Sequence, residues 1–283
     1  MRTVYIDGSF VPENEATVSI FDRSFLFSHG VYEVTSVING GLIDHMGHMK
    51  RLKLSLEGAL IPFEVDSDHI LRIQKRLIEM NNLDEGLIYL QISRGAEDRD
   101  FLPTPSLQPS IVMFTQEKAL LDPPQARDGI RIVSVPDIRW RRRDVKAVSL
   151  LAPVLAKETA RQHGVQDAWM IEDGYVTEGT SNNAYIITRD NVIVTRHLSH
   201  DILHGITRQA VLSVAQSMNM TVEERPFTIE EAYSAREAFI SSASTLVWPV
   251  VEIDGKSIMD GKVGAVTREI RRQYIKASLE RLM

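Results

Sequence analysis

Two ionisable residues, Lys146 and Glu178, have the side chains and the surroundings that covalent and acid–base chemistry requires. Lys146 lies in RRRDVKAVSLLAPVLAKETA, after a charged run and at the start of an apolar stretch. We expect this lysine to be partly removed from water, which lowers the pKa of its ammonium group and makes the amine nucleophilic. Such an amine forms a Schiff base with an aldehyde. Glu178 lies in YVTEGTSNNAY, where its carboxylate can accept a hydrogen bond from a protonated ring nitrogen.

Three places in the sequence have the groups that bind a phosphate. Gly205-Ile206-Thr207 opens the predicted helix GITRQAVLSVAQ, where free backbone N–H groups and the helix dipole favour an anion. Residues 241–244 form a Ser-Ser-Ala-Ser turn with N–H groups and hydroxyls, and Arg51 adds a guanidinium. Each of these alone is equally typical of a helix cap, a turn or a surface charge. An amine, a carboxylate and a phosphate cup together are the groups that hold pyridoxal 5′-phosphate.

Composition restricts the class of protein. The 283 residues carry a net charge of −6 and no cysteine, which excludes disulfides, thiolate metal sites and cysteine nucleophiles. The negative charge argues against a nucleic-acid partner. The N-terminus lacks the apolar core of a signal peptide, and no apolar run approaches the roughly 20 residues of a membrane span. We expect a cytoplasmic protein with no nucleic-acid and no membrane partner.

Motifs for other chemistries are missing from the sequence. The histidines at 48, 163, 197, 200 and 204 show no metal-ligand spacing, so we predict no metal site. No HExxH, P-loop, GxGxxG or GxSxG motif occurs. The basic run Arg139–Arg143 is interrupted by Trp140, and we interpret it as a solvated or interdomain charge patch.

The pattern of apolar residues predicts an α+β fold. In the first half, strands are predicted within 3–12, 21–45, 86–95 and 109–116, and helices over 46–60 and 66–82. In the second half, strands are predicted within 130–138, 167–195 and 237–244, and helices over 151–164, 205–219, 228–235 and 263–282. Strands cluster instead of alternating strictly with helices, which favours α+β over a doubly wound parallel sheet. Residues 118–127, which contain paired prolines, are predicted to link an N-terminal domain (1–117) to a C-terminal domain (128–283).

The motifs as a set resemble those of the fold type IV pyridoxal-phosphate enzymes, and within them the D-amino-acid transaminases. The matching stretches, which follow in order along almost the whole chain, are FDRSFLFSHGVYEV, HMKRL, LIYLQISRG, DIRWRRRDVKAVSLL, LAKETA, VTEGTSNNAY, GITR and PVVEIDGK. The resemblance implies a small α+β N-terminal domain and a larger C-terminal pseudo-barrel, with the cofactor between them. It also implies a homodimer in which both subunits contribute to each pocket region.

The resemblance assigns roles to matching positions. Lys146 matches the Schiff-base lysine that also moves the proton, and Glu178 matches the partner of the pyridine nitrogen. The positions that match the phosphate cup are Arg51, Ile206, Thr207, Ser242 and Ala243. Leu203 would pack against the ring, and Tyr32, Tyr89 and Arg99 would line the substrate side.

The chain departs from the transaminase pattern near the substrate. The usual arginine and histidine that hold the substrate carboxylate correspond to Arg99 and Phe101, so the histidine is missing. Ala243 stands for a usual threonine, and Leu246 and Trp248 for a glutamate and a threonine.

We predict a ping-pong transaminase that exchanges the amino group of D-alanine or a similar D-amino acid with 2-oxoglutarate or pyruvate. Alternatives of the same fold are a branched-chain L-amino-acid transaminase, an amine transaminase and an aminodeoxychorismate lyase. A non-catalytic dimer that binds the cofactor is an alternative of another class.

Overall fold

The computed structural model describes residues 1–283, which divide into two compact units. The first unit comprises Met1–Ala119, Val145–Ser149 and Arg281–Met283, and the second comprises Leu120–Asp144 and Leu150–Glu280. The chain first changes unit after Ala119, inside the segment predicted as a linker, and that segment runs into a short helix, α4 (Pro124–Asp128). Lys146 therefore belongs to the first unit, although the segments that precede Val145 and follow Ser149 belong to the second.

The first unit is built on a six-stranded sheet in which all neighbouring strands are antiparallel. Its strands are β1 (Thr3–Ile6), β2 (Ser9–Pro12), β3 (Gly30–Ile38), β4 (Gly41–Leu42), β5 (Gly86–Ser93) and β6 (Ser110–Glu117), in the order β2-β1-β6-β5-β3-β4. Five of them lie inside stretches predicted to contain strands, and β6 extends one residue beyond the predicted 109–116. The long central pairing of β3 with β5 places alternate residues of β3 on opposite faces.

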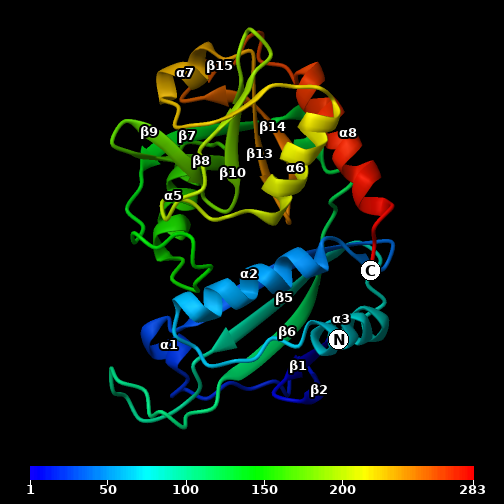
Figure 1. The fold of residues 1–283 in the computed structure, drawn as a ribbon, viewed down its shortest axis with the longest axis vertical. Helices are drawn as coiled ribbons and strands as arrows, with labels where there is room; N and C mark the ends of the chain where they lie inside the picture. Colours follow the sequence, from blue (N-terminus) through cyan, green and yellow to red (C-terminus); the bar gives the residue numbers. More distant parts are fainter. The chain divides into compact units, whose positions relative to one another are not determined.

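Two helices, α2 (His45–Gly58) and α3 (Ser67–Met80), cover this sheet (Figure 1). α2 packs on β3, and α3 packs on β1 and β6. The Asp66 side chain caps α3 by accepting a hydrogen bond from the His69 N–H. Apolar residues of both helices meet β3, β5 and β6 in one buried core, so the predicted 3.6-residue periodicity marks the face that packs.

The strands predicted within 21–45 are confirmed by β3 and β4, but a short helix at the start of this stretch, α1 (Arg23–Phe27), was not predicted. The Asp22 carboxylate accepts a hydrogen bond from the Ser24 N–H and caps the first turn, and Ser28 ends it in the left-handed conformation at φ 55°. A capped single turn lacks the length that a periodic pattern needs in order to be visible in sequence.

The second unit contains a curled mixed sheet. Its strands are β7 (Ile130–Pro136), β8 (Asp167–Glu172), β9 (Tyr175–Gly179), β10 (Asn183–Ile187), β11 (Ile193–Thr195), β12 (Val222–Glu224), β13 (Glu237–Ser242), β14 (Leu246–Ile253) and β15 (Lys256–Ser257). The order is β12-β11-β10-β13-β14-β7-β8-β9, with β15 on β14. β9 also contacts β10, so the sheet curls toward closure as the predicted pseudo-barrel requires. Strands β12, β14 and β15 were not predicted.

Four further helices surround this sheet: α5 (Leu151–Gln162), α6 (Ile206–Ser217), α7 (Ile229–Ser234) and α8 (Ala265–Leu279). α5 packs on β7 and β8, while α6 and α8 pack against each other and on β13 (Figure 1). The α+β class and the larger pseudo-barrel predicted from the sequence are confirmed. None of the helices is both long and apolar enough to cross a membrane.

Candidate active site

The backbone of Lys146 is fixed to the first unit by hydrogen bonds on both sides. The Tyr32 N–H donates to the Lys146 carbonyl at 3.0 Å, and the Val148 N–H donates to the Gly30 carbonyl at 3.0 Å. On the other side, the Lys146 N–H donates to Ser55 Oγ of α2 at 3.1 Å. The neighbouring Val145 is part of the apolar core of this unit. The lysine is therefore held at the edge of β3.

The side chain of Lys146 lies over an aromatic stack. Its Nζ is 4.2 Å from the centroid of the Tyr32 ring, close enough for cation–π attraction. Tyr32 stacks on Tyr89 with centroids 5.6 Å apart, and Tyr89 stacks on Phe114. Burial raises the pKa of the Tyr89 phenol, and Tyr32 adds to this effect. The structure thus brings the half-buried Lys146 together with the phenols of Tyr32 and Tyr89, which were predicted to line the substrate side.

Arg51 is anchored by a glutamate that the sequence analysis did not select. Arg51 Nε and Nη2 donate to Glu33 Oε1 and Oε2 at 2.8 and 2.7 Å, and His48 Nδ1 lies 2.7 Å from Glu33 Oε2. Burial alone raises the pKa of Glu33, but Arg51 and His48 outweigh it and lower that pKa to about 2. The guanidinium predicted to bind phosphate is therefore oriented by a permanently charged partner.

Arg99 lies in a different environment from Lys146. Its guanidinium stacks on the rings of Phe27 and Phe101, at 5.1 and 5.7 Å from their centroids. Glu97, which flanks Arg99 in sequence, pairs instead with the buried Arg23 at 3.1 Å. None of these contacts joins Arg99 to Lys146, Tyr32 or Tyr89.

Arg23 orders the loop that carries Arg99. Its two terminal nitrogens donate to the carbonyls of Asp100 and Phe101 at 2.7 and 2.8 Å. The two hydrogen bonds from Arg23 fix the backbone of this loop, while the Arg99 side chain stays exposed to solvent.

Glu178 is one of the buried acids of the second unit. Its carboxylate accepts hydrogen bonds from the Arg139 guanidinium, from Asn183 Nδ2 at 3.1 Å and from the Leu203 N–H at 3.2 Å. Burial raises the pKa of Glu178, and Arg139 opposes this shift. A carboxylate has about four acceptor positions, so these donors leave capacity for one more. This capacity fits a protonated ring nitrogen.

Apart from Arg51, which belongs to the first unit, the residues predicted to hold phosphate lie at two places in the second unit. Ile206 and Thr207 begin α6, whose N-terminus has no side-chain cap, so its N–H groups suit an anion. The second place is the turn between β13 and β14, where Ser242 Oγ lies 3.2 Å from Ser244 Oγ and 2.9 Å from Thr245 Oγ1. Ala243 is half-buried in this turn.

Gly205, which immediately precedes α6, packs closely against Asn183, a hydrogen-bond donor to Glu178. A Cβ at Gly205 would lie 2.0 Å from Asn183 Oδ1, which no structure tolerates without a shift. Asn183 also donates to the Leu203 carbonyl at 3.0 Å and to Glu178. Leu203, predicted to pack on the ring, thus contacts Glu178 through its own N–H. Gly205, Asn183, Leu203 and Glu178 thus form one packed assembly, and it brings the residue predicted to bind the ring nitrogen close to the start of α6, where phosphate binding is predicted. This arrangement fits pyridoxal 5′-phosphate.

The structure corrects the interpretation of the basic run as a solvated patch. Arg143 is buried and the Arg139 side chain nearly so, and both pair with carboxylates inside the second unit. Arg141 and Arg142 do face solvent. In sequence, the two inward arginines differ from the exposed ones only by their spacing of four residues, in the segment that follows β7.

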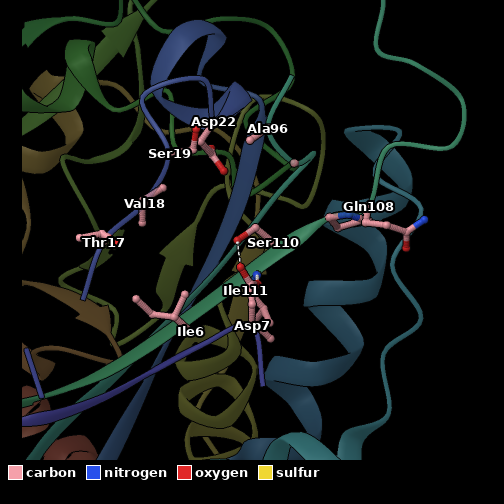
Figure 2. Close-up of a pocket in the computed structure, with 12 residues that line it drawn as sticks. Ile6, Asp7, Thr17, Val18, Ser19, Asp22, Ala96, Gln108, Ser110 and Ile111 are labelled. Carbon is pink, nitrogen blue, oxygen red and sulfur yellow. Dashed lines mark hydrogen bonds between the residues drawn. The ribbon is translucent and has the colours of Figure 1, made fainter. Parts of the chain in front are cut away.

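A separate cavity of about 530 Å³ lies in the first unit (Figure 2). Its polar lining includes Asp7 and Asp22, but both have partners already. Asp7 accepts from Ser110 Oγ at 2.7 Å, and Asp22 accepts from Ser93 Oγ at 2.6 Å. No cluster of metal-ligating side chains occurs there or elsewhere in the structure, so we assign no chemistry to this cavity.

Known proteins resemble this chain over nearly its whole length. Residues 30–253 match the family described as amino-transferase class IV. The D-alanine aminotransferase of Staphylococcus aureus (strain MSSA476) is 36% identical over 279 residues, which cover 98% of each protein.

Two solved structures share the fold. The branched-chain amino acid aminotransferase of Escherichia coli superposes with a TM-score of 0.91 at 23% identity, covering 98% of this chain and 94% of that one. A branched-chain amino acid aminotransferase from T.th., solved with pyridoxamine 5′-phosphate, has a TM-score of 0.88 at 25% identity, covering 99% and 95%.

Proposed function

The chain belongs to the class IV aminotransferases, and we propose that within this family it is a D-amino-acid transaminase that accepts D-alanine. It is an enzyme that uses pyridoxal 5′-phosphate to exchange amino groups between amino acids and 2-oxo acids. The D-alanine aminotransferase of Staphylococcus aureus, 36% identical over 98% of the chain, supports the choice of donor. The acceptor would be 2-oxoglutarate or pyruvate.

The roles of the residues follow from their settings. Bound pyridoxal 5′-phosphate supplies an aldehyde for the amino group and a ring that delocalises the electrons of the substrate Cα. We assign to Lys146 Nζ the removal of the proton from the substrate Cα and its delivery to the carbon of the former aldehyde group, after which water would release the 2-oxo acid. Glu178 holds positive charge at the ring nitrogen. The phosphate is assigned to Arg51, Ile206, Thr207, Ser242 and Ala243, and the ring face to Leu203.

The observation that carries the proposal is the setting of Glu178. A buried carboxylate with an arginine, two neutral N–H donors and one remaining acceptor position is suited to a protonated nitrogen. Tyr32 and Tyr89, beside the Lys146 amine, would contact the substrate. Arg99 would bind the substrate carboxylate without a histidine, because Phe101 takes that position.

A half-reaction tests the choice of donor. The purified yellow protein is mixed with D-alanine and, separately, with L-leucine, and the visible band of the bound cofactor is followed. Bleaching by D-alanine alone supports the proposal. Bleaching by L-leucine alone would assign the protein to the branched-chain transaminases instead, as the fold of the Escherichia coli enzyme would allow.

The Lys146→Ala variant is the control for chemistry. It should bind the cofactor and lose turnover by on the order of 10³-fold or more, because both the covalent attachment and the proton transfer depend on the amine. A wild-type protein that stays yellow with every donor would indicate a binding protein without catalysis.

We also propose that the enzyme is a cytoplasmic homodimer with domains 1–117 and 128–283 joined by residues 118–127. The net charge of −6 and the absence of cysteine are compatible with the cytoplasm. Light scattering after size exclusion should give twice the chain mass of 31.9 kDa. A monomer that retains full turnover would contradict the dimer.

A further inference from the structure

The inward arginines of the basic run form a chain of alternating charges that ends at Glu178. The Arg139 guanidinium pairs with Glu178 Oε1 and, through Nη2, with Asp137 Oδ2 at 2.6 Å. Asp137 Oδ2 lies 3.6 Å from Arg143 Nη1, which pairs with Glu172 Oε2 at 2.7 Å. The order is therefore Glu178, Arg139, Asp137, Arg143 and Glu172.

This chain runs from the buried acid toward solvent. Side-chain exposure is 5% for Glu178, 11% for Arg139, 0% for Asp137 and 2% for Arg143, and it rises to 30% for Glu172. Two arginines thus serve three carboxylates inside one unit. Buried charges of this kind persist only when each has a close opposite partner.

The Arg139 guanidinium donates hydrogen bonds to two acids. Asp137 receives more of them than Glu178, because Arg139 Nε donates to Asp137 Oδ1 at 3.0 Å in addition to the Nη2 contact. The Thr177 hydroxyl donates a further hydrogen bond to Asp137 Oδ2 at 2.6 Å. Burial raises the pKa of Asp137, but the bonds and charge of Arg139 outweigh it and hold that pKa below its usual value. Glu178 receives a single N–H of the guanidinium, and its pKa stays raised by burial.

Removal of the Arg139 charge would leave Glu178 with only two neutral donors, Asn183 and the Leu203 N–H. A buried carboxylate without a cation nearby takes up a proton. A protonated Glu178 has no charge with which to stabilise a positive ring nitrogen.

We propose that Arg139 is a positioning residue that keeps Glu178 ionised, so that the ring nitrogen of bound pyridoxal 5′-phosphate stays protonated. The inference rests on the proposed role of Glu178. Arg139 needs no contact with substrate or cofactor for this function, because it acts through Glu178. Arg139, the first residue of the basic run, then supports the cofactor site and is not a surface feature, whereas Arg141 and Arg142 face solvent.

The test measures the protonation of the ring nitrogen directly. Wild type and variants are reconstituted with pyridoxal 5′-phosphate labelled with ¹⁵N in the ring, and the nitrogen resonance is recorded near neutral pH. Wild type should show a protonated nitrogen. Arg139→Met and Arg139→Gln should move the resonance toward that of a neutral pyridine, while Arg139→Lys, which keeps the charge, should restore the wild-type signal. The Gln variant keeps an N–H donor and covers the case in which the Met variant does not fold.

Arg143→Met is the matched control. It removes the same charge from a similarly buried arginine in the same chain of charges, but Arg143 does not contact Glu178, so the resonance should stay at the wild-type position. With the loss of ring protonation, kcat of the Arg139→Gln variant should fall about 10²-fold, and that of Arg143→Met much less.

Two outcomes are decisive and separable. A wild-type resonance in Arg139→Gln, together with a neutral one in Glu178→Gln, would overturn the role of Arg139 and leave that of Glu178 intact. A protonated nitrogen in Glu178→Gln would instead overturn the proposed role of Glu178, and with it the inference.

Discussion

Glu33 in the first unit and Glu178 in the second are both buried glutamates paired with an arginine, yet their pKa values move in opposite directions. They are 1% and 4% exposed. Glu33 takes two N–H groups of Arg51 and lies 2.7 Å from His48 Nδ1, and its pKa is lowered to about 2. Glu178 takes one N–H of Arg139, which it shares with Asp137, and its pKa is raised.

Two acids with nearly the same burial can therefore have pKa values shifted in opposite directions. The direction depends on how many hydrogen bonds each carboxylate accepts from a nearby cation. Glu33 acts as a fixed anchor that orients Arg51, the arginine proposed to bind phosphate. Glu178 remains sensitive to its surroundings, which suits a group that has to balance a proton on a neighbouring nitrogen. Substituting Glu33, Glu178 or a neighbouring residue one at a time tests whether the two acids have these different roles.

The largest effect on stability is expected from Glu33→Gln. This change leaves the buried Arg51 without its anion, which typically costs about 3–5 kcal/mol, and frees the guanidinium to turn away from the phosphate. Chemical denaturation of the apoprotein should show the loss, and the affinity for pyridoxal 5′-phosphate should fall, while kcat at saturating cofactor changes little. Unchanged cofactor affinity would show that Glu33 does not orient Arg51.

The same anchor predicts a dependence of stability on pH. The pKa of Glu33 is about 2 when folded, below its ordinary value of 4.5, so its contribution is complete above pH 4.5 and is lost as pH falls toward 2. Linkage makes this loss about 3 kcal/mol. The free energy of unfolding of wild type should fall across this window, and Glu33→Gln should show a flatter profile. Parallel profiles for the two proteins would contradict the assignment.

Glu178→Gln should have the opposite signature. Turnover should fall about 10²-fold, about 2.7 kcal/mol, because the amide cannot balance a charged nitrogen. The apoprotein should keep its stability, since the ionised Glu178 is already disfavoured by burial and Arg139 retains Asp137. Steady-state kinetics and thermal unfolding measure the two effects. A large drop in stability with little loss of kcat would mean that Glu178 is only structural.

The smallest effect is expected from Gly205→Ala. The new Cβ would meet Asn183 Oδ1 at 2.0 Å, and the shift should cost about 2 kcal/mol and weaken cofactor binding through Asn183. Gly164→Ala is the comparison, because no atom lies within 4 Å there and only its φ of +67° opposes the change. Cofactor titration should separate them, since Gly164→Ala should leave the affinity unaltered. Equal affinity in both variants would contradict a link from α6 to Glu178.

Much of the fold was predictable because it depends on local patterns. The alternation in β5 and the apolar face of α3 are visible in sequence and are the faces that pack. The single capped turn of α1 and the strands β12, β14 and β15 were missed. Short elements of this kind are set by their neighbours in space, which no window of sequence contains.

The sequence by itself determined which side chains can do chemistry: an amine at 146, a carboxylate at 178 and a guanidinium at 51. The chemical types of these three groups indicated a site for pyridoxal 5′-phosphate. The tertiary structure alone decided how each is supported. Glu33 meets Arg51 across 18 positions and Arg139 meets Glu178 across 39, and whether a buried acid keeps its charge depends on such long-range partners. Burial and shared hydrogen bonds exist only once the chain has folded, so the state of each acid could not be read from its type.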